Sequence, residues 1–116
     1  MVMKTPVKGV TTANPAHPRT ELKEVYGSKG TLGANDDKTH TLQVSATVTH
    51  VPEVTARVVT MQIWDEENPH MWKVFASRDK GLYGYLFSPN GDHKTYFIDS
   101  NWTSGKEYTL KTVIYA

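Results

Sequence analysis

Hydrophobic and polar residues alternate with a period of two along much of the chain. Between residues 40 and 51, Leu42, Val44, Ala46 and Val48 are separated by threonine, glutamine and serine. This spacing places one set of side chains on each face of a half-buried antiparallel strand. No window of ten or more residues keeps the i, i+3, i+4 apolar spacing of an amphipathic helix. The pattern therefore predicts an all-β domain.

The same alternation predicts further strands, each bounded by residues that are typical of turns. The expected strands are about 19–25, 40–51, 56–64, 71–76, 82–88, 94–98 and 107–115. Residues 27–40 are expected to form a long loop, Pro89-Asn90-Gly91-Asp92 a tight hairpin, and Trp102 to Gly105 another turn. About seven strands at regular spacing favour a single β-sandwich or jelly-roll domain over residues 1–116.

Charge and composition exclude several kinds of partner. The formal net charge is +1 and the 13 basic residues are scattered, which does not indicate a nucleic-acid-binding protein. No apolar run is long enough to span a membrane, and Met1 to Val10 lacks the apolar core of a signal peptide. The chain has no cysteine, and its five histidines lack metal-ligand spacing, so no metal site or cofactor is expected.

Two segments combine strand alternation with polar chemistry. In the first, Arg19, Glu21 and Lys23 share one face, an arrangement suited to the floor of a groove for an anionic polymer. In the second, Thr60, Gln62 and Trp64 are expected to share one face of a strand.

These two segments resemble motifs of the alginate lyase 2 family, polysaccharide lyase family 7. The family's first motif, Arg-(Thr/Ser)-Glu-(Leu/Val)-Arg, reads Arg19-Thr20-Glu21-Leu22-Lys23 here, and its second, Gln-(Ile/Val)-His, reads Gln62-Ile63-Trp64. The segments GVTTANPAHPRTELKE, VVTMQIWD and GKEYTLKTVIYA also look like the family. The resemblance implies a concanavalin A-like jelly roll of two stacked curved sheets, with a substrate groove on the concave face.

The chain departs from the family pattern in two places. Trp64 stands where the family has its histidine, and an indole cannot act as a base at neutral pH because it only donates hydrogen bonds. The family's third motif, a Tyr-Lys-Ala-Gly-x-Tyr-like strand with the catalytic tyrosine, is absent. The resemblance therefore implies an incomplete jelly roll that corresponds to the N-terminal part of a family domain. Such a sheet would leave an open edge and exposed apolar surface, so self-association is expected.

The resemblance implies β-elimination on a uronate polymer such as alginate, with an extracellular or periplasmic location. By analogy Arg19 and Gln62 would hold the substrate carboxylate, since an arginine fork binds carboxylates bidentately. Glu21 would orient Arg19, and Lys23 and Trp64 would contact the substrate.

Two other interpretations stay open. The chain could be a noncatalytic carbohydrate-binding β-sandwich that keeps the groove without the chemistry. It could also be a structural β-sandwich, in which Arg19 and Glu21 form only an ion pair and Gln62 is an ordinary half-exposed strand amide.

Overall fold

The computed structural model describes residues 1–5, 20, 22, 25–26, 29–30, 39–63 and 72–114. Within these ranges the chain forms strands, turns and extended segments, and no helix. Consequently, none of the described segments is an apolar helix of membrane-spanning length.

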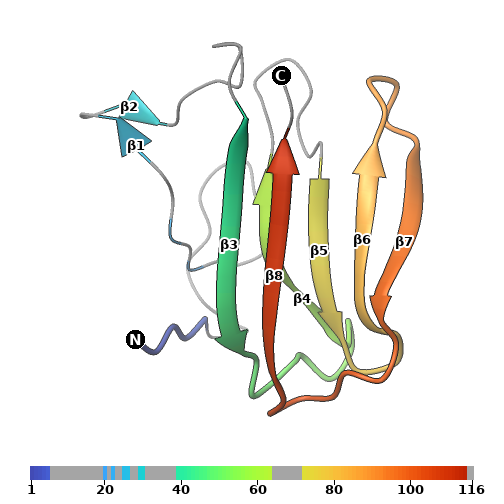
Figure 1. The fold of residues 1–116 in the computed structure, drawn as a ribbon. Coiled ribbons are helices and arrows are strands. Elements are labelled where there is room, and N and C mark those ends of the chain that lie inside the picture. Colours follow the sequence, from blue (N-terminus) through green and yellow to red (C-terminus); the bar gives the residue numbers. More distant parts are fainter. Residues whose placement is uncertain are drawn as a thin grey trace.

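Most of the described chain lies in two antiparallel sheets (Figure 1). One sheet pairs β3 (His40–Thr47) with β8 (Glu107–Ile114). The other has the order β4 (Arg57–Ile63), β5 (Trp72–Ser77), β6 (Gly81–Phe87) and β7 (His93–Asp99). A short separate pair joins β1 (Val25–Tyr26) to β2 (Lys29–Gly30).

The expected strands from residue 40 onward are confirmed, with ends that differ by a few residues. Of the expected strand over residues 19–25, the structure describes Thr20 and Leu22, which lie outside any strand, and Val25, which begins β1. The Thr20 hydroxyl instead donates to the carbonyl of Lys4 and accepts from Thr5. β2 lies inside the segment that was expected to be a loop.

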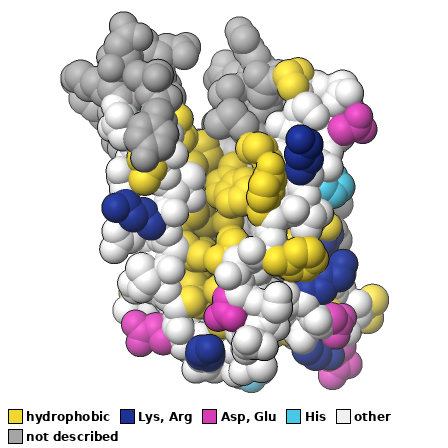
Figure 2. Space-filling view, turned by 45° about the vertical axis from the view of Figure 1, so that its right-hand side comes forward, with side chains coloured by type: hydrophobic (Ala, Val, Ile, Leu, Met, Phe, Trp, Pro, Cys, Tyr) yellow, Lys and Arg dark blue, Asp and Glu magenta, His cyan; other side chains and the backbone are white. Residues whose placement is uncertain are grey.

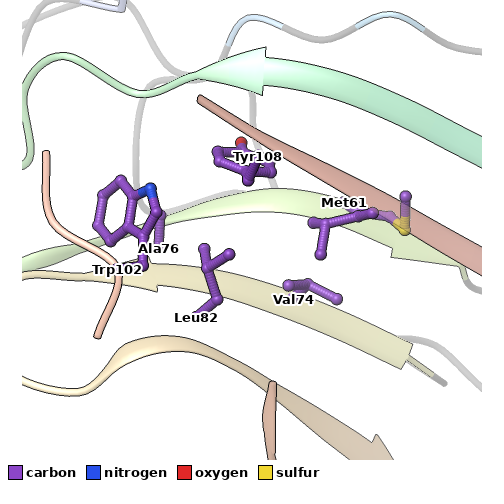
Figure 3. Close-up of a cluster of buried hydrophobic side chains, with 7 residues drawn as sticks. Met61, Val74, Ala76, Leu82, Trp102 and Tyr108 are labelled. Carbon is purple, nitrogen blue, oxygen red and sulfur yellow. The ribbon is translucent and has the colours of Figure 1, made fainter. Parts of the chain in front are cut away.

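The hydrophobic core lies between the two sheets (Figure 3). Its buried members are Met61, Val74, Ala76, Leu82, Trp102, Tyr108 and Leu110, and Val44, Ala46, Val48, Val58 and Trp72 pack against them. Burying a large apolar side chain contributes about 1.5–3 kcal/mol, so this cluster is the main force that holds the sheets together.

The connection between β7 and β8 contributes the largest buried side chain. Trp102, expected within a turn, is 2% exposed, and its indole N–H donates to the carbonyl of Lys106 at 2.9 Å. The turn itself is confirmed at Gly105, whose φ is +90° and whose N–H donates to the carbonyl of Val48. The sequence pattern identified the turn, and core packing was the preferred interpretation for most of a group of aromatic residues that included Trp102.

The expected hairpin between β6 and β7 is confirmed. The strands end at Phe87 and resume at His93, so residues 88–92 form the connection, one position earlier than expected. The N–H of Ser88 bonds the carbonyl of Asp92, and Gly91 has a φ of +90°. Glycine adopts this left-handed conformation without steric cost, so the Asn-Gly pair marked the turn correctly.

Candidate functional site

Among the described residues, a group of aromatic and cationic side chains lies on the face of the four-stranded sheet that points away from β3 and β8. Val74 and Ala76 of β5 point into the core, so the alternate residues Lys73, Phe75 and Ser77 point to the opposite side. We call this side the outer face. It carries Arg57, Val59, Gln62, Lys73, Phe75, Ser77, Tyr83, Tyr85, Phe87, His93, Thr95 and Phe97.

Gln62 belongs to a row that runs across the whole sheet. It lies opposite Lys73, Lys73 lies opposite Tyr85, and Tyr85 lies opposite Thr95. Adjacent strands are about 4.8 Å apart, so the backbones at Gln62 and Tyr85 are about 10 Å apart. The row therefore presents an amide, an ammonium group, a phenol and a hydroxyl along one line of the outer face.

A β-bulge in β4 brings Arg57 onto the same face as Gln62. The two residues are five positions apart, and in a regular strand an odd separation places side chains on opposite faces. The register of β4 against β5 shifts between Val59 and Met61, which leaves Thr60 as the extra residue. Thr60 was expected to share the face of Gln62. It is instead the bulged residue, with a buried hydroxyl oxygen.

The Arg57 guanidinium is held by three aromatic side chains. It donates to the hydroxyl oxygen of Tyr83 at 2.7 Å and to that of Tyr85 at 3.2 Å, and lies 4.3 Å from the centre of the Phe75 ring. A cation over an aromatic face is attracted by the ring quadrupole, so the stacking and the two hydrogen bonds fix the orientation of the guanidinium. Within the described part of the chain, both groups to which Arg57 donates hydrogen bonds are neutral phenols.

These contacts change the acidity of the groups around Arg57. The hydrogen bond from Arg57 lowers the pKa of Tyr85, whereas burial outweighs that bond and raises the pKa of Tyr83. The bond to Tyr83 raises the pKa of Arg57 itself. Partial burial, followed by the charge of Arg57, lowers the pKa of Lys73. The outer face thus combines a permanent cation with a phenol that loses its proton more readily than an ordinary tyrosine.

Aromatic rings extend this surface toward β7. The rings of Tyr85 and His93 are 4.0 Å apart, and Tyr83 packs against Phe97, which is 64% exposed. Rings of this kind offer flat apolar surfaces on which sugar rings can stack. His93 is exposed, and its ring lies at a tilt of 31° against that of Tyr85.

Of the residues that the sequence predicted for the site, the structure describes Gln62, which is half-buried on the outer face. Arg19, Glu21, Lys23 and Trp64 lie outside the described residues, so their convergence with Gln62 stays a prediction. Sequence reasoning missed Arg57 and Lys73, and it considered Tyr85 as a groove-lining aromatic without placing it beside Gln62. In the described ranges no group of three or more histidine, aspartate and glutamate side chains is placed to hold a metal ion.

Comparison with known proteins gives a match to one family. The family model described as alginate lyase matches residues 1–115, nearly the whole chain. Neither the search of curated proteins nor that of solved structures found a match.

Proposed function

Because the chain belongs to the alginate lyase 2 family, we propose that it acts on a uronate polymer such as alginate and cleaves it by β-elimination. The proposal includes a single jelly-roll domain over residues 1–116, with the outer face as its concave substrate groove. It also includes action outside the cytoplasm, where such polymers occur. No cofactor is required, because the reaction needs only acid, base and charge stabilisation.

The row through Gln62 is the observation that supports this proposal best. An amide and an ammonium group lie opposite each other at Gln62 and Lys73, and a guanidinium lies nearby at Arg57. A polymer with one carboxylate on every sugar requires such donors along its path. Tyr85, His93 and Phe97 add rings beside these donors, so the outer face matches both the charged and the flat parts of a polyuronate.

In β-elimination a base removes the proton at C5 of a uronate, and the bond from C4 to the glycosidic oxygen breaks. The electron pair of the C5–H bond forms the C4–C5 double bond, and the leaving oxygen takes a proton from a general acid. The carboxylate must be neutralised so that charge can develop next to it. We assign this task to Arg19 and Gln62, with Glu21 orienting Arg19 and with Lys23 and Trp64 contacting the substrate.

A matched pair of variants tests the proposal. Gln62 lies opposite Lys73 on the outer face, and an exposed glutamine, Gln43, lies opposite Lys111 on the other sheet. With alginate as substrate, the ultraviolet absorbance of the unsaturated product should rise with time. Gln62→Ala should lower kcat/KM by about 10²-fold, the usual effect of removing one preorganised donor, whereas Gln43→Ala should leave it unchanged.

A noncatalytic carbohydrate-binding role is the second candidate, and Trp64 favours it because an indole cannot replace the family's histidine as a base. Saturable alginate binding that Gln62→Ala weakens, with no unsaturated product, would support this role. A wild-type protein that binds neither alginate nor polyglucuronate would contradict both candidates.

A further inference from the structure

Arg57 lacks a carboxylate partner among the described residues that it contacts. A guanidinium has five N–H donors, and the bonds to Tyr83 and Tyr85 use two of them. Their oxygens are neutral while the phenols are protonated, so these contacts orient the positive charge without neutralising it. Because the side chain is only half-buried, its remaining donors can reach a ligand on the outer face.

A pocket of about 340 Å³ opens beside this guanidinium. It is lined by Thr55, Arg57, Ser77, Asp79, Lys80 and Tyr83. The lining contains two cations and one carboxylate, so it carries a net positive charge of one. The Lys80 ammonium nitrogen lies 5.7 Å from the centre of the Tyr83 ring, on the same side of the sheet as Arg57. One bound carboxylate would neutralise this pocket.

We propose that Arg57 forms a second carboxylate-binding position on the outer face, which holds a different uronate unit of the polymer from the unit at Gln62. This inference rests on the proposed function. A guanidinium can bind a carboxylate by donating two parallel hydrogen bonds to its oxygens. Its fixed orientation over Phe75 lowers the entropy that it loses on binding.

The spacing of the two positions explains why they bind separate units. Gln62 lies opposite Lys73, and Arg57 lies opposite Ser77, four residues further along β5. At about 3.4 Å per residue the two backbone positions are about 14 Å apart. The Arg57 guanidinium reaches back to Tyr85 in the row of Gln62, but the pocket that it lines lies at the Ser77 end of β5. The Arg57 position therefore recognises the polymeric character of the substrate, whereas Gln62 recognises a single uronate.

Binding measurements on three variants test this position. Calorimetric titration with a long alginate oligosaccharide should show about tenfold weaker binding for Arg57→Gln, the effect of one charge-assisted contact. Lys111→Gln, which removes an exposed cation from the other sheet, should bind as the wild type does. Arg57→Lys keeps the charge but loses the fork, so its affinity should lie between those of the wild type and Arg57→Gln.

Oligosaccharide length and salt provide the second readout. The affinity lost in Arg57→Gln should disappear when a single uronate sugar replaces the long oligosaccharide, and salt should weaken the variant less than the wild type. Circular dichroism and melting curves establish that each variant is folded. If Arg57→Gln does not fold, Arg57→Lys and the salt dependence of the wild type decide the question.

The outcomes separate this inference from the proposed function. Equal affinity of wild type and Arg57→Gln for the long oligosaccharide would overturn the second position and leave the proposed function intact. An equal loss for the long oligosaccharide and the single sugar would also overturn it. Absence of any polyuronate binding by the wild type would overturn both.

Discussion

Arg57 controls the acidity of Tyr85. Its guanidinium donates to the phenol oxygen at 3.2 Å, which favours the tyrosinate and lowers the pKa of Tyr85. An unperturbed tyrosine has a pKa of about 10, so Tyr85 titrates below that value in the folded chain. As pH falls through the folded pKa, the stability that this group contributes is lost, and it is fully present above the unfolded value.

Replacing Arg57 with glutamine should therefore raise the pKa of Tyr85. Tyrosinate absorbance during an alkaline titration measures this change, and a Tyr85→Phe variant identifies which part of the curve belongs to Tyr85. Wild-type and Arg57→Gln proteins with the same tyrosinate curve would show that the guanidinium does not act on this phenol.

Alternation along β4 correctly predicted that Gln62 lies on a polar face, because the strand is regular from Met61 onward. Arg57 could not be assigned to that face, since the extra residue at Thr60 reverses the parity and no local signal marks the bulge. Lys73, and the place of Tyr85 beside it, were missed for a different reason. Their place beside Gln62 depends on the register between strands, which alternation within one strand does not determine.

Among the elements of the fold, the connection between β7 and β8 is held in place because its Trp102 side chain packs in the core. Its indole packs with Leu82 and Tyr108, and its N–H closes the turn at Lys106 (Figure 3). This contact holds β8 over the four-stranded sheet, and therefore keeps the two layers of the sandwich together.

Trp102→Ala should lower the free energy of unfolding by about 3–5 kcal/mol, the usual effect of deleting a buried aromatic ring. Trp102→Phe should lower it by less, because a ring still fills most of the space. Urea denaturation measures both values, and Val54→Ala serves as a control because Val54 is 96% exposed. Equal stability of Trp102→Ala and the control would contradict the assigned role.

Where a strand lies along the chain was easier to predict than which other strand it pairs with. Residues 40–51 and 107–115 alternate cleanly because each has one face on the core, and they became β3 and β8. The segment around Thr20 alternates as well, but alternation gives no information about whether a neighbouring strand is available to bond it. Turn residues marked the connections, whereas the exact ends of the strands depended on pairing across the sheets.

In the molecule as a whole, the sheet of β3 and β8 covers only part of the sheet of β4 to β7. In Figure 2 the molecule is turned so that the side of β6 and β7 comes forward, and hydrophobic side chains gather in the middle of the visible face. Leu86, Tyr96 and Ile98 are 43–47% exposed on this side. Tyr96 also packs edge-on against Trp72, so the exposed patch is continuous with the core.

This apolar surface supports the expectation of self-association, because burying it against a second molecule removes it from water. Light scattering after size-exclusion chromatography should show a mass that rises with protein concentration. Ile98→Lys should shift the protein toward the monomer, whereas Val54→Lys, which changes a residue outside the patch, should not. A wild-type protein that stays monomeric at every concentration would contradict this prediction.

We propose that the outer face of β4 to β7 binds the uronate polymer. The most direct test is an NMR titration of the isotope-labelled chain with an alginate oligosaccharide. Binding at the outer face should change the chemical shifts of Gln62, Lys73 and Tyr85. It should leave unchanged those of Gln43 and Lys111, the same kind of pair on the other sheet. Changes confined to Gln43 and Lys111, or no changes anywhere, would contradict it.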